Sequence, residues 1–182
     1  MLYIMRHGKT DWNEKNKLQG RTDIALNEEG RRTAVAVQKE CADIGFDVCY
    51  VSPLIRAKET AEIALKDLNV PIITDDRLCE MCFGIYEGVE NAAEEPGSPI
   101  DIFFNSPEKY IAPENAESFE QLFERTGSFI KDVINRDLAD NKKILIVGHG
   151  AMNCSIICQI KNIPLKNFWD IGIPNCRLIK LC

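Results

Sequence analysis

The segment LYIMRHG, residues 2–8, places a short apolar run directly before an arginine, a histidine and a glycine. The run at residues 2–5 is bounded and apolar, which is typical of a buried strand. His7 is one of only two histidines in the chain. The segment therefore predicts that a core strand delivers Arg6 and His7 together to its carboxyl end.

Four further runs share this character. They are short, apolar and rich in β-branched residues, as buried strands are, and they cover residues 47–51, 71–74, 143–148 and 177–181. Amphipathic patterns with helical spacing lie between them. Because strands alternate with helices, we expect an α/β fold, a three-layer sandwich whose mostly parallel central sheet is flanked by helices.

Local signals place the helices between these strands. Asn27 is a suitable N-cap for the first long helix, and Ser52 followed by Pro53 suits the cap and first position of the next. The stretch 116–139 is the longest amphipathic candidate. A further helix should follow Gly150.

Residues 89–115 depart from this pattern. The segment holds four prolines and shows no clean period. We therefore expect an irregular insertion, a lid over a functional site, within a single domain that spans residues 1–182. Its aromatic residues Phe103, Phe104 and Tyr110 could contact an apolar leaving group or anchor the segment to the core.

Composition limits the possible functions. The 182 residues are 45% hydrophobic and 27% charged, as in a single globular domain. The formal net charge of −6 disfavours a nucleic-acid-binding surface. No apolar run approaches the ~20 residues of a membrane helix, and the start of the chain lacks the pattern of a signal peptide. Eight cysteines without such a signal are typical of reduced thiols, so we expect a cytoplasmic protein without a membrane partner.

The polar residues that follow the strands converge. In open α/β sheets, ligands bind beyond the carboxyl ends of the strands. His7 follows the first predicted strand and His149 follows the fourth, each with a glycine after it. Either histidine alone is more simply a structural residue, but the two together favour a site at this edge.

Arg56 adds an argument for an anion. It falls near the start of the helix after the second strand, where a positive charge opposes the helix dipole at a cost of about a few tenths of a kcal/mol. An ion pair with Glu59 or Asp11 is a simple alternative. A bound phosphate explains Arg6 and Arg56 together, because guanidinium groups match phosphate oxygens in bidentate geometry.

Six motifs occur in order between residues 6 and 150. They read RHGKTDWN, LQGRTDIALNEEG, SPLIRAKETA, CEMCFGIYEG, ENAESFEQLFERT and IVGHG. In this order they resemble the motifs of the histidine phosphatase superfamily, in particular the phosphoglycerate-mutase-like proteins of its branch 1. A lone Arg-His-Gly would carry little weight, but six motifs in register cover nearly the whole chain. The resemblance implies a phosphoglycerate-mutase-like fold and phosphoryl transfer through a phosphohistidine.

The resemblance also implies a role for each of five residues. His7 corresponds to the nucleophile, whose neutral ring nitrogen attacks phosphorus and takes the phosphoryl group. Arg6, Arg56 and His149 correspond to the pocket that holds the phosphoryl oxygens and stabilises the charge of the transition state. Glu80 corresponds to the general acid that protonates the leaving alkoxide and later activates water.

Other positions match with less weight. The family positions that contact phosphate or substrate fall on Asn13, Gln19, Gly20 and Gly150. On the residues alone, the acid could equally be Glu87 or Asp76. Lys9 departs from the pattern, standing where glutamine or glutamate is commoner, and Ala116 stands where glycine is commoner. The resemblance implies no metal ion and no cofactor, because arginine and histidine supply the positive charge.

The charges of residues 89–115 favour a hydrolase over a mutase. A mutase binds a more negatively charged substrate and needs extra basic residues, whereas this segment offers Lys109 against six carboxylates. We therefore expect a histidine acid phosphatase-type phosphoric monoester hydrolase that acts on a small phosphorylated metabolite and releases inorganic phosphate. A cofactor-dependent phosphoglycerate mutase and an α-ribazole phosphatase-type specificity are the alternatives. The substrate and the oligomeric state stay open.

Two hypotheses come from other classes of protein. The thiol pairs Cys79/Cys82 and Cys154/Cys158 could bind zinc or form a redox switch. No histidine lies beside either pair as a further metal ligand, and cysteine commonly fills small gaps in a core. A binding protein without turnover is disfavoured, because the nucleophile, the acid and both arginines are all present.

Overall fold

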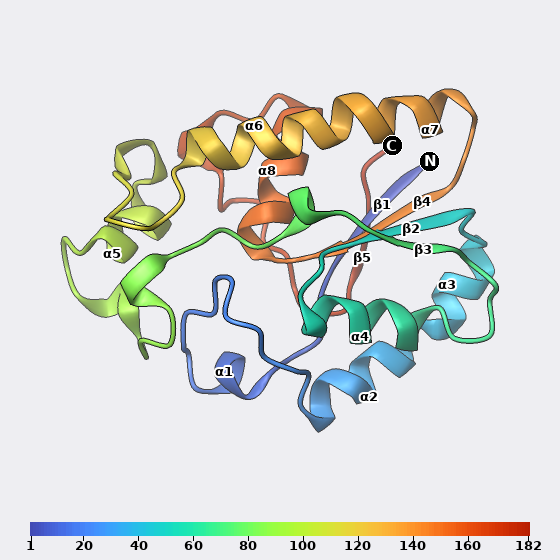
Figure 1. The fold of residues 1–182 in the computed structure, drawn as a ribbon, viewed down its shortest axis with the longest axis horizontal. Coiled ribbons are helices and arrows are strands. Elements are labelled where there is room, and N and C mark those ends of the chain that lie inside the picture. The colour runs from blue at the N-terminus through green and yellow to red at the C-terminus, as the bar shows by residue number, and fades with distance from the viewer.

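The central sheet of the computed structural model, which describes residues 1–182, has five strands in the order β3-β2-β4-β1-β5 (Figure 1). The strands are β1 (Leu2–Arg6), β2 (Val48–Val51), β3 (Ile72–Thr74), β4 (Ile144–Gly148) and β5 (Leu178–Lys180). β4 is parallel to both β1 and β2, β2 is parallel to β3, and β5 is antiparallel to β1. All five predicted strands are confirmed, and each end lies within one residue of its prediction.

Helices cover both faces of the sheet (Figure 1). One face carries α2 (Glu28–Ala36), α3 (Gln38–Ile44) and α4 (Ile55–Ala64), and the other carries α6 (Phe119–Phe129), α7 (Asn135–Ala139) and α8 (Gly150–Lys161). Successive side chains of a strand point to opposite faces. In β4, Ile144 and Ile146 join the core under α6 and α8, while Leu145 and Val147 join the core under α4. This arrangement confirms the predicted three-layer α/β sandwich.

Two helix starts test the capping predictions. The Asn27 side chain accepts a hydrogen bond from a backbone N–H of the first turn at 2.8 Å, which confirms Asn27 as the N-cap of α2. The predicted start at Ser52 is wrong, because α4 begins at Ile55 with Leu54 in the cap position. The Ser52 hydroxyl contacts the ring of His149 instead.

The long amphipathic stretch forms a nearly continuous helical run. It begins at Phe119, after a capping box made by Ser118 and Gln121, and passes through one π-helical turn at Ile130–Ile134 before α7. The predicted helix after residue 149 is confirmed as α8. None of the helices has the length and hydropathy of a membrane-spanning segment.

Residues 89–115 are more regular than predicted. They contain α5 (Pro99–Asn105) and 3-10 turns at Ala92–Glu94 and Pro107–Lys109. Ser98 caps α5 by accepting a backbone N–H of the first turn at 3.1 Å, and Ile100 and Phe103 are fully buried on one helix face. The prediction of irregular structure is wrong here because Pro99 opens a helix rather than breaking one.

Candidate active site

The carboxyl ends of β1 and β4 lie side by side, and a histidine follows each of them. Arg6 is the register partner of Gly148, and the His7 N–H donates to the Gly148 carbonyl at 2.9 Å. The ring centroids of His7 and His149 are 5.1 Å apart. The two histidines of the chain therefore meet at one edge of the sheet, as their positions after the strands predict.

A cavity of about 510 Å³ opens at this edge. Eight of the nine predicted site residues contribute to its wall: Arg6, His7, Asn13, Gln19, Gly20, Arg56, Glu80 and Gly150. The ninth, His149, is not part of the wall, and its ring is completely buried beside His7. The structure thus brings the nine predicted residues together, eight of them on the wall and His149 directly beside His7.

The hydrogen bonds of His7 assign its tautomer. Its Nδ1 lies 2.7 Å from the Gly8 carbonyl oxygen. A carbonyl oxygen can only accept, so Nδ1 carries the proton and Nε2 keeps a free lone pair. Burial lowers the pKa of His7 well below its ordinary value, and the positive charges of Arg56 and Arg6 lower it further. The imidazole is therefore neutral at pH 7, which is the form that a nucleophile requires.

Ser52 assigns the tautomer of His149. Its Oγ lies 2.7 Å from His149 Nε2 and also accepts the Leu54 N–H at 3.3 Å. The hydroxyl proton has no acceptor other than Nε2, so Ser52 donates and the ring proton of His149 sits on Nδ1. His149 Nδ1 is buried and has no partner within the protein. Burial, followed by the charge of Arg56, lowers the pKa of His149, so a neutral ring with one unpaired N–H donor stands beside His7.

Replacing Ser52 by alanine should lower kcat/KM about 10- to 100-fold, by analogy with the loss of an orienting hydrogen bond on a metal-binding histidine. Ser52→Thr retains the hydroxyl and should recover most of the activity. Nitrogen NMR of His149 reads the tautomer directly. We expect a protonated Nδ1 in the wild type and a mixture of tautomers in Ser52→Ala. An Nε2-protonated ring in the wild type would contradict the assignment.

Two arginines at the cavity, the fully buried Arg56 and the partly buried Arg6, form no ion pair. Arg56, the second residue of α4, donates to the carbonyl oxygens of Thr22 at 2.9 Å and Gly20 at 2.7 Å, and Arg6 donates to that of Ile173 at 3.3 Å. Neither arginine forms an ion pair, and the Nε of each has no partner. Burial lowers the pKa of both guanidinium groups, because the protein interior disfavours their charge.

The alternative ion pair for Arg56 is not formed. Glu59 binds Arg31 at 3.0 Å and accepts the Leu26 N–H at 2.8 Å instead. A buried charge that forms no ion pair is costly, and an anion in the cavity would offset that cost. The pair of arginines is therefore suited to a phosphate group.

The side-chain amides of Asn13 and Gln19 present donors to the same cavity. Asn13 lies in the short helix α1 (Asp11–Glu14), where its Oδ1 accepts the Thr10 N–H at 3.1 Å. Gln19 Oε1 accepts the Thr10 hydroxyl at 3.0 Å. With both oxygens occupied, the NH₂ groups are free to donate to an anion. Next to them, Gly20 has a positive φ of 54°, and a Cβ there would lie 2.1 Å from a Glu87 oxygen, so only glycine fits.

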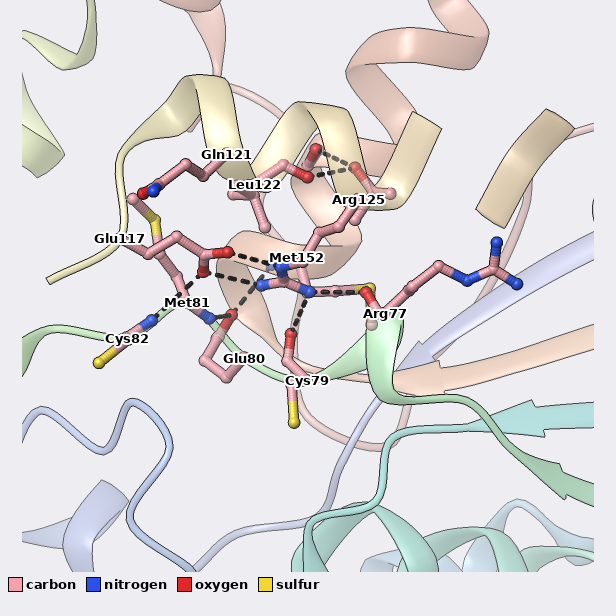
Figure 2. A network of polar contacts seen from close by, with 12 residues as sticks. Arg77, Cys79, Glu80, Met81, Cys82, Glu117, Gln121, Leu122, Arg125 and Met152 are labelled. Atoms are coloured by element: carbon pink, nitrogen blue, oxygen red, sulfur yellow. Dashed lines mark hydrogen bonds and ion pairs between the residues drawn. The ribbon is translucent and has the colours of Figure 1, made fainter. Parts of the chain in front are cut away.

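Glu80 binds the first turn of α8 (Figure 2). Its Oε1 accepts the N–H groups of Met81 at 2.9 Å and Met152 at 3.0 Å, and its Oε2 accepts that of Ala151 at 3.2 Å. The helix N-terminus, with its free N–H groups, attracts this carboxylate. Glu80 is thereby held at the cavity wall, beside the backbone of Gly150.

An ion pair that the sequence analysis missed holds the segment around Glu80 (Figure 2). Arg125 of α6 binds Glu117 through Nε at 2.6 Å and Nη2 at 2.9 Å, and its Nη1 donates to the carbonyl oxygens of Arg77 and Cys79. The Glu117 N–H donates to the Cys82 carbonyl at 2.8 Å. The pair thus ties the chain on both sides of Glu80 to the start of α6. Glu117 and Arg125 are eight residues apart and both lie in the motif ENAESFEQLFERT. Their place in one motif was the sequence signal by which this ion pair could have been found.

The structure separates Glu80 from the other candidate acids. Glu87 accepts hydrogen bonds from the N–H groups of Arg21, Thr22 and Phe83, so both its oxygens hold loops together. Glu87 and Asp76 are both absent from the cavity wall. Lys9, which departs from the family pattern, is exposed and also lies off the wall.

The thiol pairs lie in surroundings that disfavour thiolate chemistry. All eight cysteines are free. Cys154 and Cys158 are buried in the core, and burial raises the pKa of Cys154 and raises that of Cys158 to about 11. Burial also raises the pKa of Cys79. Zinc ligation and thiol exchange both require the thiolate, so these environments oppose the zinc and redox hypotheses.

Comparison with known proteins relates this geometry to a family. The family model described as the histidine phosphatase superfamily (branch 1) matches residues 2–182. The chain is 34% identical to the uncharacterized phosphatase PhoE of Bacillus subtilis over 98% of this chain and 83% of that protein. It is 28% identical to the probable phosphoglycerate mutase GpmB of Escherichia coli over 99% of this chain and 83% of that protein. The structure of Bacillus stearothermophilus YhfR matches with a TM-score of 0.88 at 29% identity, over 97% of this chain and 88% of that one.

Proposed function

The chain belongs to branch 1 of the histidine phosphatase superfamily, and from that membership we propose that it is a phosphoric monoester hydrolase of the histidine acid phosphatase type. In this proposal it acts without a metal ion, through a phosphohistidine at His7, on a small phosphorylated metabolite. The observation that carries the proposal is the free Nε2 lone pair of His7 at a cavity where two arginines, the fully buried Arg56 and the partly buried Arg6, form no ion pair.

The first half of the proposed reaction transfers the phosphoryl group to the protein. His7 Nε2 attacks phosphorus in line, a nitrogen–phosphorus bond forms, and the ester bond between phosphorus and oxygen breaks. Glu80 gives its proton to the departing oxygen, which leaves as an alcohol. Arg6, Arg56 and the Nδ1–H of His149 stabilise the charge on the transferred group.

The second half releases phosphate. Glu80, now a carboxylate, removes a proton from water as the water oxygen attacks phosphorus. The nitrogen–phosphorus bond breaks, the electron pair returns to His7 Nε2, and inorganic phosphate leaves. The Asn13 and Gln19 amides, whose oxygens are both occupied by Thr10, supply further donors to the phosphoryl oxygens.

Charge at the cavity supports hydrolysis over phosphoglycerate mutase activity. Apart from Arg6 and Arg56, Lys17 is the only cation on the wall. Residues 89–115 contribute Glu94 to the wall and no basic residue. A substrate with a second phosphate would therefore meet little additional positive charge. We also propose that residues 1–182 act as one domain, with residues 89–115 as a cover for the site, in the cytoplasm.

A panel of phosphomonoesters assayed with excess EDTA tests this function. The protein should release inorganic phosphate at the same rate with and without the chelator, because arginine side chains supply the positive charge. The matched assay supplies 3-phosphoglycerate together with 2,3-bisphosphoglycerate. Conversion to 2-phosphoglycerate faster than phosphate release would overturn the choice of hydrolase, and loss of activity in EDTA would overturn metal independence.

A further inference from the structure

The cavity extends well beyond the groups that would hold a phosphoryl group. Its volume of about 510 Å³ lies in the range of about 300–1,000 Å³ that holds drug-sized ligands. Besides the phosphate-binding residues, the wall includes Ala92, Phe104 and Trp169. The leaving group of the substrate must fit against this second part of the wall.

Two aromatic rings form a fixed surface there. The ring centroids of Phe104 and Trp169 are 5.0 Å apart, and each ring also packs against the fully buried Phe103, at 5.0 and 5.1 Å. The Trp169 Nε1–H donates to the Phe103 carbonyl at 2.8 Å, so the one polar atom of the indole is already satisfied. Phe104 is still 36% exposed, as a ring at a cavity wall can be. The surface offers apolar ring faces and no free donor.

The remaining wall carries little net positive charge for a second anion. Ala92 and Ala93 present only methyl groups. The charged residues outside the phosphate-binding group are Lys17 and Glu94, one of each sign, and the uncharged amides of Asn16 and Asn91 are the other polar side chains. The Lys17 ammonium also lies 5.9 Å from the centroid of the Trp12 ring, which can hold it by a cation–π interaction. A carboxylate on the leaving group would gain little in these surroundings.

We propose that the preferred substrates of this protein are phosphomonoesters whose alcohol carries a flat apolar ring, and that Phe104 and Trp169 bind that ring. The proposal rests on the phosphatase function proposed above, and it adds the class of leaving group. Phosphorylated hydroxy acids, which are smaller and carry a carboxylate, are the poorer substrates. Aromatic rings favour offset or edge contacts with one another, which gives the pair its selectivity.

Three alkyl phosphates separate binding of the ring from the chemical reactivity of the leaving group. Their leaving alcohols differ little in reactivity, whereas aryl and alkyl leaving groups differ greatly. They are 2-phenylethyl phosphate, ethyl phosphate and O-phosphoserine. The wild-type kcat/KM should be highest for the phenylethyl ester. Phe104→Leu and Trp169→Leu should each lower it about two- to tenfold, mainly through KM, because an aromatic contact binds ground and transition states alike. Turnover of ethyl phosphate should stay unchanged in both variants.

Ile111→Ala is the matched control, because this residue lies in the same segment, is 84% exposed and does not line the cavity. Ile111→Ala should leave kcat/KM unchanged for all three esters. Phe104→Leu keeps the test valid if Trp169→Leu fails to fold. A higher kcat/KM for phosphoserine than for the phenylethyl ester, or equal losses on all three esters in Phe104→Leu, would refute the ring site while leaving the phosphatase function intact. Absence of hydrolysis of all three esters by the wild type would instead refute the function.

Discussion

Replacement of His7 by alanine should reduce phosphatase activity by about 10⁴- to 10⁶-fold, as loss of a nucleophile does in other covalent hydrolases. The expectation follows from the ring itself, since Nδ1 is anchored on the Gly8 carbonyl and Nε2 is the atom left free at the cavity. No neighbouring side chain can replace it, because His149 Nε2 is occupied by Ser52. Steady-state hydrolysis of one phosphomonoester, with a melting curve for each protein, measures the effect.

Phosphate binding should partly survive in the same variant. Arg6 and Arg56 keep their carbonyl contacts and still lack an anion. Calorimetric titration with inorganic phosphate should therefore detect binding to His7→Ala, and Arg56→Leu should show much weaker binding. A His7→Ala protein that hydrolyses esters as fast as the wild type would show that the nucleophile is another residue.

Glu80→Gln should give the second large effect, a loss of about 10²- to 10⁴-fold for alkyl phosphates, because a general acid of this kind contributes that much. The loss of kcat/KM, which reports only the steps up to phosphoryl transfer to His7, should be far smaller for p-nitrophenyl phosphate, whose leaving group departs without a proton. The ratio of the two losses is informative because it does not depend on the fraction of protein that is folded. This matters, since glutamine would turn an NH₂ group toward backbone N–H donors that now bind the carboxylate.

Asp76→Asn is the control for that variant. Asp76 is an exposed carboxylate four residues before Glu80, and it lies off the cavity wall. Asp76→Asn should leave the hydrolysis of both alkyl phosphates and p-nitrophenyl phosphate unchanged. Equal losses of kcat/KM on alkyl and p-nitrophenyl esters in Glu80→Gln would indicate that Glu80 positions the site and does not donate a proton.

Much of the fold could be predicted from short apolar runs, for a physical reason. A buried parallel strand needs apolar side chains on both faces, so residues 2–5 and 143–148 stand out from their polar neighbours. The convergence of His7 and His149 follows from strand direction alone, because parallel strands end at the same edge. The sequence could not reveal that the His149 ring lies below the cavity wall, since that depends on side-chain packing from several elements.

Residues whose roles depend on distant partners were beyond pattern analysis. Ser52 has the sequence context of an N-cap, but its hydroxyl serves a histidine 97 positions away. Pro99 looked like a break in residues 89–115, but it opens α5 after the Ser98 cap, and the burial of Ile100 and Phe103 against the core holds that helix in place. The contacts of Arg125 with the chain around Glu80 also span more than 40 residues. Local propensity carries no information on such contacts.

The most direct measurement is a rapid acid-free quench during turnover, followed by peptide mass spectrometry under neutral conditions. The account predicts one added phosphoryl group on the peptide that contains His7, located on that imidazole, labile to acid and absent from His7→Ala. It also predicts that Glu80→Gln accumulates more of this adduct from p-nitrophenyl phosphate, because its hydrolysis slows. A phosphoryl group on any other residue, or active turnover in which no phosphoprotein accumulates in either protein, would contradict the account.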